Sequence, residues 1–204
     1  MTEGVIKFQI EKWEESGPVD AAVYGEIEKA RKRLYQMNFI GHNPEYNLGF
    51  GNISSRLNAG DFVITGSQTG HLENLDGSYY SIINGYNFEN NSVCGRGPAK
   101  PSSESLSHAA LYHSSAKINT VIHIHASRLW NRLYDTHPCY TPVNAEYGSI
   151  ELYNSLTELM TGQKTSLPAV IVMRGHEDGI IIGAGSVDDG MAALDFILEK
   201  NSDI

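Results

Sequence analysis

The sequence has little cysteine and no long apolar run, and each shortage excludes a class of protein. Cys94 and Cys139 do not form a CxxC pair, which disfavours a disulfide framework or a cysteine zinc site. The longest apolar runs, such as residues 169–173, fall far short of the roughly 20 residues that a membrane helix needs. We therefore expect neither a disulfide-stapled fold nor a membrane-spanning segment.

Positive charge is also scarce. The chain has 15 Lys and Arg against 24 Asp and Glu, a formal net charge of −9, and the basic residues form no cluster. A general nucleic-acid binder needs a basic patch, so we expect no nucleic-acid partner. The first residues lack both a positive leader and an apolar signal core, which predicts an intracellular, cytoplasmic protein without a membrane partner.

The remaining composition is that of an ordinary globular protein. With 204 residues, 41% hydrophobic and 19% charged, the chain is long enough to bury a sizeable core. It contains neither an internal repeat nor a low-complexity linker. We therefore expect residues 1–204 to form a single domain.

Three helices are expected from apolar residues at helical spacing and from capping residues. The first covers residues 19–38, and the second opens at Ser102–Glu104, where Ser and Glu favour a cap and a first turn. The third covers 187–200, with Ser186 as N-cap and Asp189 completing a capping box.

Strands are expected where β-branched or apolar residues alternate or form short runs between turn residues. These strands cover residues 48–57, 61–65, 119–126, 167–173 and 179–183. Between 66 and 101 we expect only short strands, for example around 79–83. Helices and strands interleave, and short turns join neighbouring strands, which predicts an α/β sandwich with a mixed or largely antiparallel sheet.

The pair His123 and His125 is the most informative for chemistry. In a strand, residues two apart project from the same face, so both imidazoles lie on one side and Ile122 and Ile124 on the other. Two such imidazoles can share one metal ion at metal–nitrogen distances of about 2.0–2.1 Å. The ordinary alternative is a pair of partly buried structural histidines.

Glu104 stands at the start of the helix that leads into this strand. His108 and Tyr112 follow at i+4 and i+8, so these three polar side chains could lie on one helix face and point toward the same site. The ordinary alternative is that Glu104 complements the helix dipole and that the other two are surface residues. For His108 and Tyr112 we adopt this alternative.

His176 offers a third imidazole, between an apolar strand and the Asp-Gly pair at 178–179. Together with Glu104, His123 and His125 it would complete a set of nitrogen and oxygen ligands suited to zinc or a similar divalent ion. Because the set lacks thiolates and can exchange a ligand for water or substrate, it fits a catalytic site better than a closed structural one.

Three short segments combine small side chains or hydroxyls with backbone N–H groups, as anion sites do. They are Gly51-Asn52, Thr69-Gly70 and Ser102-Ser103, and the last precedes a helix N-terminus. Each has an ordinary explanation as a turn or a helix cap.

Five motifs, taken in order, carry a resemblance to a known family. They are Gly51-Asn-Ile-Ser54, the segment VITGSQTG at 63–70, Pro101-Ser-Ser-Glu104, His123-Ile-His-Ala126 and His176. The chain resembles the class II aldolase/adducin family, whose members include aldolases, epimerases and dehydratases. The resemblance spans most of the chain from Gly51 to Gly183.

The resemblance implies a role for each motif. Glu104 would be the catalytic acid/base and a metal ligand, and His123, His125 and His176 would bind Zn²⁺ or another divalent metal ion. The implied phosphate pocket consists of Gly51, Asn52, Thr69, Gly70, Ser102 and Ser103. The implied fold is a single-domain three-layer α/β/α sandwich with a mostly antiparallel central sheet, assembled as a homotetramer with active sites at subunit interfaces.

The chain departs from the family pattern at three places, one of which is the loop before Thr69-Gly70, which carries an extra residue or so. The family's third histidine is usually followed at once by glycine, whereas Glu177 and Asp178 separate His176 from Gly179. The stretch between His137 and Leu156 is compressed, and Tyr140 and Tyr147 are the candidates there for the interface tyrosine.

These residues predict a metal-dependent lyase that cleaves a small, phosphorylated ketose by a reversible retro-aldol reaction through a metal-stabilised enediolate. The same metal could serve a sugar-phosphate 4-epimerase, a dehydratase or a decarboxylase, since one scaffold hosts several reactions. A non-catalytic, adducin-like binding domain is the alternative of another class.

Overall fold

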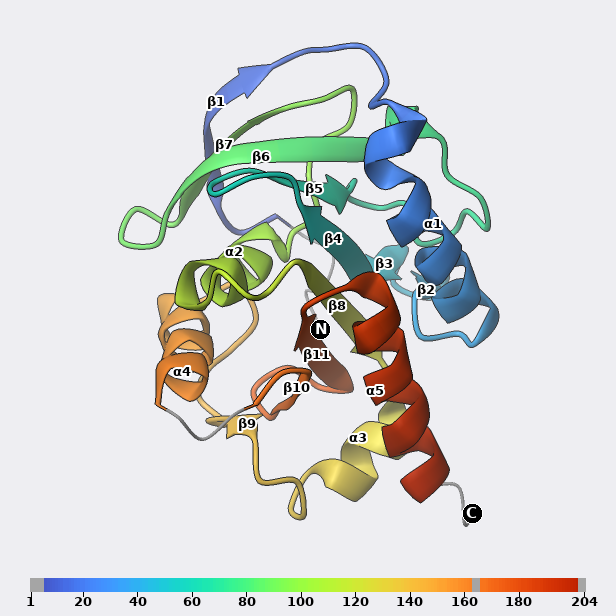
Figure 1. Ribbon diagram of the computed structural model, residues 1–204, viewed down its shortest axis with the longest axis vertical. Coiled ribbons are helices and arrows are strands. Elements are labelled where there is room, and N and C mark those ends of the chain that lie inside the picture. The colour runs from blue at the N-terminus through green and yellow to red at the C-terminus, as the bar shows by residue number, and fades with distance from the viewer. Residues whose placement is uncertain (1–5, 163–165, 202–204) are drawn as a thin grey trace.

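A nine-stranded sheet forms the centre of the computed structural model, which describes residues 6–162 and 166–201 (Figure 1). The strand order is β1-β7-β6-β5-β4-β8-β11-β10-β9. The strands are β1 Gln9–Glu14, β4 Asn52–Arg56, β5 Phe62–Thr65, β6 Tyr80–Asn87, β7 Ser92–Arg96, β8 Thr120–His125, β9 Tyr140–Thr141, β10 Ala169–Met173 and β11 Gly179–Ala184. A separate hairpin joins β2 Gly41–Asn43 to β3 Leu48–Phe50.

Most neighbouring strands in the sheet are antiparallel. The two outermost pairs, β1 with β7 and β9 with β10, are parallel, and the pairs between them run in opposite directions. The expected mixed, largely antiparallel sheet is therefore confirmed.

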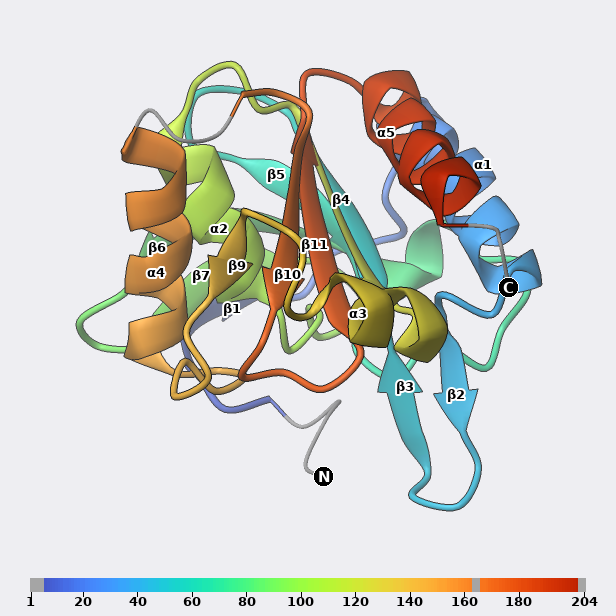
Figure 2. The same ribbon diagram turned by 90° about the horizontal axis from the view of Figure 1, so that it is seen from below.

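Helices cover both faces of the sheet, which gives the expected three layers. The helices are α1 Ala21–Gln36, α2 Ser105–Ser114, α3 Ser127–Leu133, α4 Ile150–Thr161 and α5 Val187–Lys200, with one 3₁₀ turn at Gly77–Tyr79. Figure 2 shows α2 and α4 on one side of the sheet and α1 and α5 on the other. Among the described residues, no helix combines the length and apolar character that crossing a membrane requires.

Strand β8 separates the two cores and so fixes which way its histidines face. Val121 packs in the core beneath α2 and α4, whereas Ile122 and Ile124 pack in the core beneath α1 and α5. By strand alternation, His123 and His125 share the face of Val121, as the sequence predicts.

A serine side chain caps the N-terminus of each of two helices, α4 and α5. Ser186 Oγ accepts from the backbone N–H of Asp189 and lies 2.7 Å from its carboxylate, which confirms the predicted start of α5. Helix α4, which is not among the three expected helices, starts in the same way, since Ser149 accepts from the N–H of Leu152.

Two strand predictions need correction. The expected strand 48–57 is two strands, because Gly51 has φ +70° and breaks it between β3 and β4. A Cβ at Gly51 would lie 2.7 Å from the Phe39 carbonyl oxygen, so the bend also relies on the absent side chain. The strands β6 and β7 extend well beyond the short segments expected between 66 and 101.

Candidate metal centre and anion pocket

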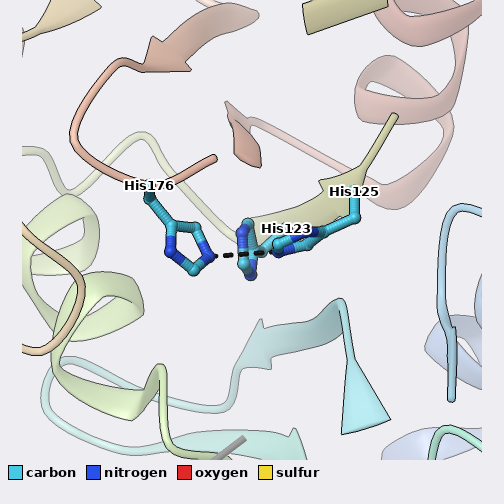
Figure 3. A group of neighbouring side chains, drawn as sticks. All are labelled: His123, His125 and His176. Atoms are coloured by element: carbon cyan, nitrogen blue, oxygen red, sulfur yellow. Dashed lines mark hydrogen bonds between the residues drawn. The ribbon is translucent and has the colours of Figure 1, made fainter. Parts of the chain in front are cut away.

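Three imidazoles converge at the end of β8. His123 and His125 come from the strand itself, and His176 comes from the turn between β10 and β11 (Figure 3). Their ligand atoms lie within 4.8 Å of one another, and His125 Nε2 is 3.0 Å from His176 Nε2. The fold therefore brings together the three histidines that the sequence predicts as ligands.

The turn that carries His176 is held by its own backbone. The N–H of His176 donates to the Met173 carbonyl, and the N–H of Gly179 donates to the His176 carbonyl. A Cβ at Gly179 would overlap the His176 ring, so glycine leaves the space that the imidazole occupies. The inserted Glu177 and Asp178 fit because Asp178 adopts φ +65° and its carboxylate accepts from Ser127 Oγ at 2.6 Å.

Burial keeps the histidine pair neutral. It holds the pKa of His123 well below the ordinary value and lowers the pKa of His125 to about 4, although Asp178 and Glu177 act in the opposite direction on His125. Neutral imidazole is the form that binds a metal ion. Since His123 Nε2 is buried without a hydrogen-bond partner among the described residues, a metal ion fits this centre.

Glu104 precedes α2 and lies beside the imidazoles. It occupies the N-cap position, but its side chain makes no capping hydrogen bond. Its carboxylate is buried, with Oε1 3.8 Å from His176 Nε2 and Oε2 accepting from Ser107 Oγ. The structure thus brings Glu104 together with the three histidines, and it turns the carboxylate away from the role of helix cap.

The interpretation of His108 and Tyr112 as surface residues is wrong. Both are buried, and Ser54 Oγ on β4 lies 2.7 Å from His108 Nδ1 and 2.7 Å from the Tyr112 hydroxyl. Burial lowers the pKa of His108 to about 3 and raises the pKa of Tyr112. The reason is tertiary, because α2 is packed between the sheet and α4 and is buried on every side from Ser105 to Tyr112.

The three segments that the sequence predicts as anion-binding line one small pocket. Its lining includes all six expected residues and Glu104, namely Gly51, Asn52, Thr69, Gly70, Ser102, Ser103 and Glu104. Ser102 Oγ accepts from the N–H of Glu104, and Thr69 Oγ1 donates to the Gly66 carbonyl. Gly49, Phe50 and the segment 66–68 complete the lining, and they were not among the predicted pocket residues.

The loop that carries Thr69 and Gly70 is anchored at two places. A Cβ at Gly70 would overlap the Gly41 carbonyl, so only glycine permits this contact between the loop and β2. Further along, the buried guanidinium of Arg31 on α1 donates to the Leu72 and Glu73 carbonyls and forms an ion pair with Glu28 at 2.6 Å. The pocket geometry thus depends on α1.

The two candidate tyrosines lie in different surroundings. Tyr147 is buried and stacks on His176, with ring centroids 5.2 Å apart and planes 27° from parallel. Tyr140 is 40% exposed, and the Arg174 guanidinium lies 3.5 Å from its ring centroid. Tyr147 is thus the candidate that touches the histidine cluster.

Several solved structures of known proteins share this fold. L-Fuculose 1-phosphate aldolase has a TM-score of 0.59 at 20% identity, with 92% of this chain and 90% of that chain covered. L-Fuculose-1-phosphate aldolase from Thermus thermophilus has a TM-score of 0.61 at 17% identity, with 90% of this chain and 93% of that chain covered. YgbL from Klebsiella pneumoniae is described as a candidate aldolase, epimerase or decarboxylase. It has a TM-score of 0.64 at 14% identity, with 89% of this chain and 87% of that chain covered.

At these identities the three structures establish the fold. The search of curated proteins found no match. The family itself is given by the sequence profile of the class II aldolase and adducin N-terminal domain, which matches residues 38–196. This range contains every predicted ligand and pocket residue, and the chain therefore belongs to the class II aldolase and adducin family.

Proposed function

We propose that this protein is a divalent-metal-dependent lyase that cleaves a small phosphorylated ketose by a reversible retro-aldol reaction. One observation carries the proposal: the cluster of His123, His125 and His176 adjoins the buried Glu104, and Glu104 also lines the anion pocket. A metal centre and an anion pocket that share an acid/base residue are what a phosphorylated substrate of this kind requires.

The three imidazoles would hold the metal ion, which we propose to be Zn²⁺. A nitrogen-rich set with one nearby carboxylate and no thiolate suits zinc and leaves a position for substrate oxygens. When bound, the ion supplies Lewis-acid stabilisation of the negative charge that develops on the ketose oxygens as the carbon–carbon bond breaks.

Glu104 is the proposed acid/base. Its carboxylate is buried and held by Ser107, at the junction of the histidine cluster and the pocket. From there it can take up and return the proton at the nucleophilic carbon of the substrate.

The pocket residues would hold the phosphate and fix the register of the reacting carbons. Neutral hydroxyls line it, among them those of Ser102 and Ser103. Backbone N–H groups and hydroxyls at the start of a helix are favourable to an anion without a basic side chain.

A tyrosine would protonate the leaving oxygen. Tyr147 is the candidate within this chain, because it stacks on His176. A tyrosine of a neighbouring subunit is the alternative if the protein forms the homotetramer that the family resemblance suggests. Light scattering after size-exclusion chromatography measures the oligomeric state, and a Tyr147→Phe variant tests the local candidate.

Epimerase, dehydratase and decarboxylase reactions use the same types of residue, and YgbL carries two of these descriptions. Identification of the products distinguishes these reactions from aldol cleavage. The histidine cluster argues against a non-catalytic, adducin-like domain, which has no need for imidazoles gathered around a shared position.

The first experiment is elemental analysis of the wild type, His123→Ala and His113→Ala. His113 is an exposed histidine of α2 outside the cluster, so it serves as the matched control. We expect about one ion per chain in the wild type and in the control, and loss of the ion in His123→Ala.

Activity is then tested with a panel of ketose 1-phosphates, by coupled detection of the released triose phosphate. No stoichiometric metal after reconstitution with Zn²⁺ would overturn the proposed metal site. Metal binding without release of triose phosphate would rule out the retro-aldol reaction on these substrates and would favour an epimerase, dehydratase or decarboxylase reaction.

A further inference from the structure

Asn52 and His123 lie directly opposite each other on the paired strands β4 and β8. Asn52 Nδ2 is 3.4 Å from His123 Nδ1, and both residues are buried, with 6% and 0% exposure. The anion pocket and the metal centre therefore meet at this cross-strand pair, because Asn52 lines the pocket and His123 belongs to the cluster.

Two buried atoms of this pair have no hydrogen-bond partner among the described residues, Asn52 Oδ1 and His123 Nε2. A buried polar atom without a partner is costly, so both atoms need an explanation. Turning the terminal amide of Asn52 by half a turn exchanges Oδ1 and Nδ2. Oδ1 then faces His123 Nδ1 and accepts its N–H.

This hydrogen bond decides the tautomer of the imidazole. A neutral imidazole carries one N–H, so a proton held on Nδ1 by an acceptor leaves the lone pair on Nε2. Nε2 is the atom of His123 that lacks a partner in the described part of the chain and is thereby available to a metal ion. The same bond also fixes the orientation of the ring.

We propose that Asn52 is a positioning residue for the metal centre, holding His123 in the Nδ1–H tautomer in addition to lining the anion pocket. This inference rests on the proposed metal site. The amide of Asn52 suits both tasks, positioning His123 and lining the pocket. Once Oδ1 faces the histidine, Nδ2 takes the former place of Oδ1 and remains a neutral donor for an anion bound in the pocket.

The test measures Zn²⁺ affinity, with Zn²⁺ alone, by competition with a chromophoric chelator. Asn52→Leu removes the acceptor at similar volume, and we expect it to weaken Zn²⁺ binding by about 10–100-fold. Asn52→Asp keeps an acceptor for the same N–H, and we expect its affinity to equal or exceed that of the wild type. The charge it adds to the pocket should at the same time weaken binding of inorganic phosphate.

Ser103→Ala is the matched control, because Ser103 is a buried residue that lines the same pocket and is not a member of the histidine cluster. We expect this control to keep the wild-type Zn²⁺ affinity. A second readout is ¹⁵N NMR of labelled histidine, which should report an Nδ1–H tautomer for His123 in the wild type and in Asn52→Asp.

The outcomes separate the two claims. Equal Zn²⁺ affinity in the wild type and Asn52→Leu overturns the positioning role alone, as does an equal loss in Asn52→Leu and Asn52→Asp. Absence of Zn²⁺ binding in the wild type overturns the proposed metal site, and the positioning role with it.

Discussion

Glu104 combines three properties that a helix-capping glutamate does not need. It is 3% exposed, it makes no capping bond, and its Oε1 lies 3.8 Å from His176 Nε2. A buried carboxylate beside a histidine cluster is a candidate for exchanging a proton with a bound molecule. Glu104, which precedes α2, thereby lies between the histidine cluster and the proposed anion pocket.

Glu104→Gln tests this assignment. Glutamine preserves the shape and the hydrogen bond from Ser107 but cannot take up the proton, so we expect turnover to fall by about 10²–10⁴-fold. Because the three histidines remain, the metal content should stay near that of the wild type. Steady-state kinetics beside elemental analysis measures both, and full activity in the variant would rule out the acid/base role.

His108 gives a prediction about acid stability. Burial holds its folded-state pKa at about 3, whereas an unfolded histidine titrates near 6.5. The unfolded chain binds this proton more readily than the folded chain. The contribution of neutral His108 to the stability of the fold is therefore fully present above about pH 6.5 and is lost progressively as pH falls toward 3.

We expect the urea midpoint of the metal-free protein to fall between about pH 6.5 and 4.5, and to fall less steeply in His108→Gln. His113→Gln is the control, because His113 is exposed. Identical slopes in the wild type and His108→Gln would contradict the buried, neutral state of His108.

At the scale of elements, α1 secures the loop of the anion pocket through Arg31. The guanidinium is 1% exposed and bonds to Glu28 and to two loop carbonyls, while the Tyr80 hydroxyl donates to Glu28 at 2.6 Å. Removing Arg31 leaves the partly buried Glu28 carboxylate without its cation and the Leu72 and Glu73 carbonyls without this donor, which is costly.

We expect Arg31→Met to reduce the free energy of unfolding by about 3–5 kcal/mol. Arg33→Met, two residues along the same helix, removes an exposed ion pair with Asp195 and should cost less than about 1 kcal/mol. Urea denaturation of the two variants beside the wild type measures the difference. Similar losses in both would mean that the Arg31 network does not anchor the loop.

At the scale of the whole molecule, the histidine cluster joins strand β8 to the turn between β10 and β11. An ion that binds only the folded arrangement stabilises the entire fold through mass action. At free Zn²⁺ about 100 times its Kd, the gain is about 2.7 kcal/mol.

For a chain of this size such a gain corresponds to an increase in Tm of about 5–10 °C. Thermal unfolding with Zn²⁺ and after treatment with a chelator measures the shift. His123→Ala should show no Zn²⁺-dependent shift, and a shift of equal size in that variant would place the ion elsewhere.

The sequence predicts those parts of the site that depend on local geometry. Period-two spacing places His123 and His125 on one face, and the capping chemistry of Ser186 locates the start of α5, both as observed. The strand pattern alone does not predict the break at Gly51, where φ is +70° and a Cβ would meet Phe39, a residue of a different segment. Strand β1 and helices α3 and α4 were likewise absent from the predicted elements.

The amino-acid sequence by itself determined the order of the motifs that carry the family resemblance, the three histidines proposed as ligands and the alternation along β8. Each of these can be read from residue type and position along the chain alone. Only the tertiary structure decided that α2 is buried on every side from Ser105 to Tyr112, where His108 and Tyr112 contact Ser54. It alone also paired Asn52 with His123 across two strands. The physical reason is that burial and cross-strand pairing depend on contacts between distant segments, which local patterns do not encode.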